Sequence, residues 1–249
     1  MPSLASIQLI DEYWSSFLGC STSDLYLNQT LVVPHSRLTD YKGALVFRRG
    51  PSCIISVPTS IAGSLLEVLR HRKPDDVFNE SFLQRLFGSA VDRIVGPAWL
   101  GYADATDFHP REIHETRLIN AADEAALRML AQSCGEAWEH SAVQLGRPLI
   151  FGCFVGDRLI AAGSLERYGP RFLQVGVVTH PAYRGRGYGT SVASAATQYA
   201  LESGNLIQCR VLESNVAAVA VAHSLGYHKY AATFAIRLLQ GDLAPGKLT

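Results

Sequence analysis

The clearest hydrophobic pattern in the chain joins a short apolar run to a helical repeat. Residues 172–178 are apolar on both alternating faces except for Gln174, which predicts a strand buried inside a sheet. Pro181 ends this strand, because proline has no N–H to donate to the ladder. Apolar residues then recur at helical spacing over 190–203, and Gly204 stands where such a helix ends. The pattern predicts a strand, a loop and a helix in direct succession.

The loop between these elements has glycine at every second position, at Gly185, Gly187 and Gly189. A glycine loop that leads into a helix collects free backbone N–H groups and the positive end of the helix dipole around an anion. We expect glycine here because a Cβ would hold phosphate oxygens away from the amides. A nucleotide P-loop is excluded because Thr190, not lysine, follows Gly189, and the spacing G-x-G-x-G fails the dinucleotide fingerprint. We therefore expect the six amides from Gly185 to Thr190 to converge on a phosphate-bearing anion.

The N-terminal region has its own succession of elements. Ser3 to Leu18 predicts an amphipathic helix. Strands are expected at 31–33, 44–47 and 53–57, and helices at 61–70 and 81–86. The stretch 93–107 predicts a short strand, a break at Gly96-Pro97 and a poorly periodic segment. Its aromatic and acidic residues either line a pocket or are packed and capping groups: Trp99, Tyr102, Asp104 and Asp107.

Beyond a boundary predicted near residues 109–114 the order of elements is regular. Asn120 should cap a helix that breaks at Gly135, and a second helical piece should follow over 136–144. Strands are expected at 116–119, 149–155, 159–167, 172–179 and 206–212, then a helix at 215–225 and strands within 227–239. The three strands from Leu149 to Thr179 should form an antiparallel meander.

The loop and a later segment together resemble one protein family. Arg184, Gly187 and Gly189 match the Arg-x-x-Gly-x-Gly diphosphate loop of the GCN5-related N-acetyltransferase (GNAT) family, and the segment 215–227 is similar to the family's N-x-x-A…L-G-Y helix. The resemblance covers about residues 113–240. It implies an α/β (α+β) fold with a mixed, splayed central sheet flanked by helices. Residues 111–249 would be the acetyl-CoA-binding domain and 1–110 an additional α/β region, either a degenerate GNAT-like half or a cover for the acceptor site.

The same resemblance implies a set of cofactor-binding residues. The pantetheine arm of acetyl-CoA (coenzyme A) would add like a strand to the backbone of the strand before the loop. The sheet must therefore part between 172–179 and 206–212. The expected cofactor-binding residues are Val177, Val178, Thr179, Arg184, Gly185, Arg186, Gly187, Tyr188, Gly189, Thr190 and Asn215.

The usual catalytic groups of the family are missing from their positions. Gln174 stands where a carboxylate often acts as base, and Ala222 stands where a tyrosine donates a proton. An amide cannot accept a proton at neutral pH, so Glu166 on the neighbouring strand is the candidate catalytic base. Its alternative is a solvent-facing strand end paired with Arg167 or Arg171. Weaker candidates are Glu139, His140, His180, His223, Tyr227 and Tyr230.

Composition narrows the function classes. Twenty-two basic and 22 acidic residues leave no net field to hold nucleic acid or an anionic membrane. Five cysteines without ligand spacing predict reduced thiols, no metal site and a cytoplasmic protein. We expect an N-acetyltransferase, with acetyl-CoA as co-substrate and a primary amine of a small molecule as acceptor. An acyl-CoA sensor without turnover, another acyl donor, a peptide amine and a homodimer stay open.

Overall fold

The computed structural model describes residues 2–35, 42–144, 146 and 149–239. Its contacts divide the chain into two units. Unit 1 comprises Met1–Ser3, Gly101–Arg210 and Val216–His228, and unit 2 comprises Leu4–Leu100, Val211–Asn215 and Lys229–Thr249. Both units contain helices packed on strands, so the predicted α/β class is confirmed. None of the helices in the described ranges combines the length and apolarity needed to cross a lipid bilayer.

Unit 2 is built around a small mixed sheet. Its strands follow the order β1 (Thr30–Pro34), β3 (Ser52–Val57), β2 (Gly43–Arg49), β10 (His228–Leu238) and β4 (Val91–Ala103). The β1–β3 pair is parallel, and the β3–β2 and β2–β10 pairs are antiparallel. The three strands predicted within residues 31–57 are confirmed. They form here because their apolar side chains alternate between two faces of the sheet that are both covered.

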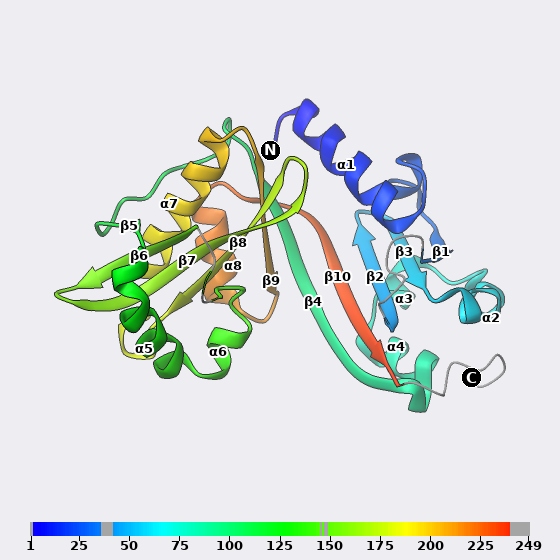
Figure 1. The fold of residues 1–249 in the computed structure, drawn as a ribbon. Coiled ribbons are helices and arrows are strands. Elements are labelled where there is room, and N and C mark those ends of the chain that lie inside the picture. The colour runs from blue at the N-terminus through cyan, green and yellow to red at the C-terminus, as the bar shows by residue number, and fades with distance from the viewer. Residues whose placement is uncertain (1, 36–41, 145, 147–148, 240–249) are drawn as a thin grey trace. The chain divides into compact units, whose positions relative to one another are not determined.

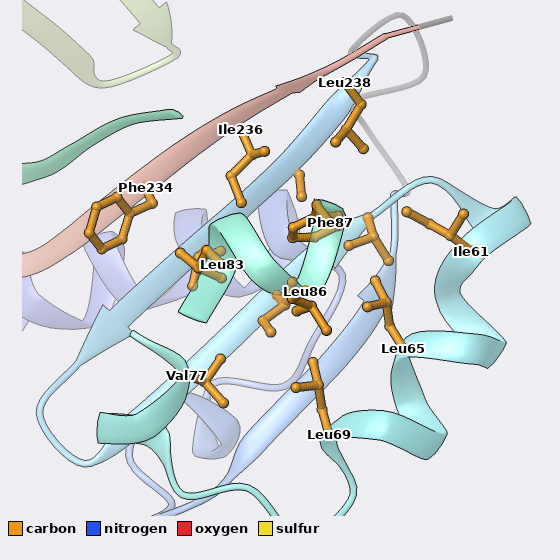
Figure 2. Packing of buried hydrophobic residues seen from close by; sticks show 14 of the residues in the cluster. Ile61, Leu65, Leu69, Val77, Leu83, Leu86, Phe87, Phe234, Ile236 and Leu238 are labelled. Carbon is orange, nitrogen blue, oxygen red and sulfur yellow. The ribbon is translucent and has the colours of Figure 1, made fainter. Parts of the chain in front are cut away.

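Helices cover both faces of this sheet. On one face α2 (Thr59–Leu69), α3 (Pro74–Val77) and α4 (Glu80–Phe87) meet the strands in a single apolar cluster. Figure 2 shows Leu65 of α2, Leu86 of α4 and Ile236 of β10 within it. On the other face α1 (Leu4–Leu18) packs Trp14 against Phe47, with ring centroids 4.8 Å apart.

One strand of unit 2 was predicted wrongly. The stretch read as a short strand, a break and an irregular segment is a single strand, β4 (Val91–Ala103). A Cβ on Gly96 would lie 2.6 Å from the carbonyl oxygen of Thr233 on β10. Glycine therefore permits a close approach of β10 here rather than ending the strand.

Unit 1 holds the strand order β9-β8-β7-β6-β5. Their bounds are β5 (Arg117–Leu118), β6 (Ile150–Val155), β7 (Arg158–Gly169), β8 (Phe172–Thr179) and β9 (Leu206–Leu212). The antiparallel meander β6-β7-β8 is confirmed, and β9 runs parallel to β8 (Figure 1). In α5 (Glu124–Cys134), Leu127 and Leu130 pack against Ala162 and Val178 on one face. In α7 (Tyr188–Glu202), Val192 packs against the opposite face.

The helix boundaries in unit 1 follow local signals with one exception, the helix after Gly135. Asn120 and Asp123 form the capping box that precedes α5, and Gly135 ends that helix with φ +52°. The second helical piece is shorter than predicted, because α6 covers only Glu136–Glu139. After α8 (Val216–Ser224) a single strand, β10, fills the stretch in which more than one was expected.

Candidate functional site

The glycine loop of unit 1 lies between the end of β8 and the start of α7. Gly187 is the N-cap of α7, with φ +87°, and it has no side chain with which to cap the helix. The first helical hydrogen bond of α7 is donated by the N–H of Ser191 to the carbonyl of Gly187, at 3.0 Å. Among the described residues, no hydrogen bond is donated by the amides from Gly185 to Thr190. The structure thus presents the run of free donors that an anion requires.

Glycine is required at the three positions of this loop for different physical reasons. Gly185 and Gly187 have positive φ, at +74° and +87°, which other residues rarely adopt. Gly189 does not, but a Cβ there would lie 2.8 Å from Oγ1 of Thr179. Besides the room expected for phosphate, glycine at position 189 therefore allows α7 to pack closely on β8.

Positive groups surround the loop. Arg184 Nε donates to the carbonyl of Thr179 at 3.3 Å, and the guanidinium of Arg186 lies 5.5 Å from the ring centroid of Tyr183. Arg158, at the β6–β7 turn, donates to Nε2 of His180 at 2.6 Å.

The arginines also act on His180. Burial and the neighbouring guanidinium groups of Arg158 and Arg184 lower the pKa of His180 below its usual value. At the strand exit, Nε2 of His180 accepts the hydrogen bond from Arg158. Sequence reasoning missed Arg158, because nothing in the turn pattern marks it as a neighbour of the loop.

The strands β8 and β9 part beside the loop. Their pairing runs from Phe172↔Leu206 to Val175↔Cys209 and ends there, although both strands continue (Figure 1). The N–H of His180 donates to Ile160 on the β7 side, at 2.8 Å. Alternation along β8 then directs the backbone groups of Val177 and Thr179 toward the parted side.

The predicted pantetheine contacts therefore divide between two edges of β8. Val178 pairs with Ala162 of β7, so its backbone groups face the meander rather than the opening. Val177 and Thr179 face the opening, and Thr179 already accepts from Arg184 through its carbonyl. The backbone at the opening that would receive a strand-like arm is thus the carbonyl of Val177 and the amides of Val177 and Thr179.

A chain of polar side chains crosses the strands next to this opening. The hydroxyl of Tyr168 donates to that of Tyr102 at 3.0 Å, and Tyr102 donates to Oε1 of Gln208 at 2.6 Å. Gln208 then donates through Nε2 to Oε1 of Gln174 at 2.8 Å. The candidate base Glu166 is paired with Gln174 across β7 and β8, so both side chains stand on the same face.

This polar chain was not visible in the sequence. Tyr102 and Gln208 are 106 positions apart, and both are buried. No local periodicity links residues so distant. The one signal in the sequence was Gln174, the single polar residue in an otherwise apolar strand. Of the aromatic and acidic residues from Trp99 to Asp107, Tyr102 joins the polar chain. Asp104 is a capping group that accepts from the backbone N–H of Thr106.

The weaker catalytic candidates have other partners or stand away from the opening. The hydroxyl of Tyr227 is hydrogen-bonded to Thr197 at 2.7 Å, and burial raises its pKa well above the ordinary value. Tyr230 donates to Asp11 in unit 2, at 2.6 Å. Tyr227 is therefore a packed aromatic group, held between elements of unit 1.

The helix residues among these candidates are mostly exposed. His140 and Glu139 are exposed on α6, and His140 pairs with Glu136 at 3.7 Å. Ala222 is buried in α8, whereas His223 beside it is exposed. The turn of the helix thus points His223 away from the position that Ala222 occupies, as expected.

Asn215 immediately precedes α8 and belongs to unit 2. Its N–H donates to the carbonyl of Leu212 at 2.9 Å. Its predicted contact with the pantetheine arm stays a prediction, as do the roles of the other expected cofactor-binding residues and of Glu166.

Comparisons with known proteins add the family. A search of curated proteins found no match. Among solved structures, a GNAT-family acetyltransferase from Colwellia psychrerythraea is 17% identical, with a TM-score of 0.49 over 60% of this chain and 59% of that one. A GCN5-related N-acetyltransferase from Kribbella flavida is 21% identical, with a TM-score of 0.49 over 60% of each chain. The matched part thus spans about three fifths of these relatives.

A third structure, of an acetyltransferase from Salmonella typhimurium with its cofactor acetyl-CoA, is 16% identical, with a TM-score of 0.39 over 51% of this chain and 94% of that one. The family model described as "Acetyltransferase (GNAT) family" matches residues 112–227. That range contains the glycine loop, the parted strands and Glu166. Residues 112–227 of this chain therefore form a domain of the acetyltransferase (GNAT) family.

Proposed function

We propose that the chain is an N-acetyltransferase that transfers an acetyl group from acetyl-CoA to a primary amine of a small molecule. The observation that carries this proposal is the run of free amides from Gly185 to Thr190 beside the parted strands β8 and β9. The first feature suits a diphosphate and the second suits an extended arm. Acetyl-CoA contains both groups in one molecule.

The residues at the loop fit acetyl-CoA by their chemistry. The free amides and the positive end of the α7 dipole would hold the diphosphate, and Arg184 and Arg186 add positive charge. At the opening the backbone of Val177 and Thr179 would bind the pantetheine amides. The N–H of Val177 would also stabilise negative charge that develops on the thioester oxygen.

Glu166 is the residue we assign as general base. It stands opposite Gln174, whose Oε1 is already occupied by the amide of Gln208. The two side chains stand on one face of the sheet, at the Cβ separation of about 5 Å that is usual for cross-strand neighbours. From this position Glu166 would remove a proton from the incoming ammonium.

The proposal is tested by release of free thiol from acetyl-CoA with a panel of amines, including small alkylamines, amino alcohols and peptides with free N-termini. We expect turnover with at least one small amine, and Glu166→Gln should lower kcat and remove the acidic limb of its pH profile. Glu202→Gln at the end of α7 is the matched control and should behave like the wild type. If the pH profile of kcat is unchanged in Glu166→Gln, water rather than Glu166 removes the proton.

A sensor without turnover is the second candidate. It is favoured by Gln174 and Ala222, which replace the carboxylate and the tyrosine that often act in this family. The two candidates differ in a single assay. Acetyl-CoA binding without thiol release for any amine supports the sensor, whereas release with a small amine supports the enzyme and with peptides alone supports a peptide acceptor.

A further inference from the structure

The segment before β5 crosses the start of α7 and is tied to it by several contacts. We name residues 111–114 the strap. The N–H of Arg111 donates to Oγ of Ser194 at 2.8 Å, and the N–H of His114 donates to Oγ of Ser191 at 3.0 Å. Both serines are buried. The strap is therefore anchored through its backbone, independently of the side chain of His114.

The side chain of His114 reaches the glycine loop. Its ring stacks on that of Tyr188, with centroids 3.9 Å apart and an interplanar angle of 13°. Its Nε2 donates to the carbonyl of Arg186 at 2.7 Å. The stack fixes the plane of the ring, and the hydrogen bond fixes one peptide group of the loop.

That peptide group also contains one of the free amides. The Arg186–Gly187 peptide is trans, so its C=O and N–H point in opposite directions. Since the carbonyl of Arg186 is directed to His114, the N–H of Gly187 is directed away from the strap. Gly187 has φ +87° and no Cβ, so without this tie its peptide is among the easiest in the loop to rotate.

We propose that His114 is a positioning residue for acyl-carrier binding, which aims the N–H of Gly187 at the diphosphate by holding the carbonyl of Arg186. The inference rests on the proposed function, because it assumes that the loop binds a diphosphate. It adds a residue outside the glycine motif whose effect is specific to the diphosphate part of the ligand. A role in packing alone would not distinguish ligands with a diphosphate from ligands without one.

The test compares two probes, acetyl-CoA by calorimetry and S-acetyl-pantetheine, which lacks the diphosphate, by NMR titration. His114→Phe keeps the stack and loses the donor, so acetyl-CoA affinity should fall by about 2- to 12-fold, the range for one net hydrogen bond. Affinity for S-acetyl-pantetheine should not change. His140→Phe, on the exposed α6 histidine, is the matched control and should leave both affinities unchanged.

The outcomes separate this inference from the proposed function. If the wild type binds acetyl-CoA and His114→Phe binds it equally well, or loses both probes in parallel, the inference is wrong. If the wild type does not bind acetyl-CoA, the proposed function itself is wrong. Should His114→Phe lower the melting temperature, His114→Gln, which keeps an N–H donor, must bind acetyl-CoA more tightly than His114→Ala; equal affinities would overturn the inference.

Discussion

A carboxylate introduced at the third position of α7 should stabilise the helix and block the ligand at the same time. With Gly187 as N-cap, Thr190 is the N3 residue, from which a glutamate side chain can reach back to the N-cap amide. Thr190→Glu would therefore place its own carboxylate on the Gly187 N–H that we assign to the diphosphate. A negative charge in the first turn also interacts favourably with the helix dipole.

The magnitude follows from two contributions. For the diphosphate to bind, the introduced glutamate side chain must leave the N–H of Gly187, which costs about 1 kcal/mol. At a separation of about 6 Å, the repulsion between the carboxylate and each phosphate charge is about 0.7 kcal/mol in bulk water. It rises to about 3 kcal/mol near a protein surface, where the effective dielectric constant is lower. Thr190 is half-buried, so we take about 1–3 kcal/mol for the charge. Together these weaken acetyl-CoA binding by about 2–4 kcal/mol, or about 30- to 900-fold.

The assay is calorimetry with acetyl-CoA, combined with thermal unfolding of the same samples. Thr190→Gln is the matched control, because it reaches the cap without the charge and should weaken binding only about 5-fold. Added salt should recover part of the affinity in Thr190→Glu, since the charge contribution is screened. Wild-type affinity in Thr190→Glu at an unchanged or raised melting temperature would refute the assignment of these amides to the diphosphate.

Two further predictions concern the local structure around the site. Gly189→Ala should lower the free energy of unfolding by about 1 kcal/mol net, because its Cβ meets Oγ1 of Thr179; in a Thr179→Ala background the same change should become stabilising, as helix propensity then dominates. Denaturant unfolding of the four variants checks the change of sign, and an equal effect in both backgrounds would contradict the contact. Hydrogen bonds from the Arg117 guanidinium and the Asn120 N–H lower the pKa of Asp123 from 3.8 to about 2. Its stabilisation is therefore complete above about pH 4 and is lost as the pH falls toward 2, so the melting temperatures of the wild type and Asp123→Asn should converge over that range; a constant difference would argue against the capping box.

The parts of the site that the sequence predicted are local in the chain. The strand β8, the proline that ends it, the glycine loop and the start of α7 are consecutive, and each has its own propensity signal. The same holds for the helix cap predicted at Asn120. Such signals survive folding because the interactions that cause them lie within a few residues of one another.

The parts that could not be predicted depend on contacts between distant segments. The strap reaches the loop across 72 positions from His114 to Arg186, and the polar chain joins Tyr102 to Gln208 across 106. The strand break predicted at Gly96-Pro97 was wrong for the same reason, because glycine is required there by the close approach of β10 and not by its neighbours in the chain.

The most direct measurement is a crystal structure of the chain with acetyl-CoA bound. We predict that diphosphate oxygens accept hydrogen bonds from amides between Gly185 and Thr190 at about 2.7–3.2 Å. The pantetheine arm should lie along Val177 and Thr179 in the opening between β8 and β9. A diphosphate bound elsewhere, or an arm that leaves this opening empty, would contradict the central claim.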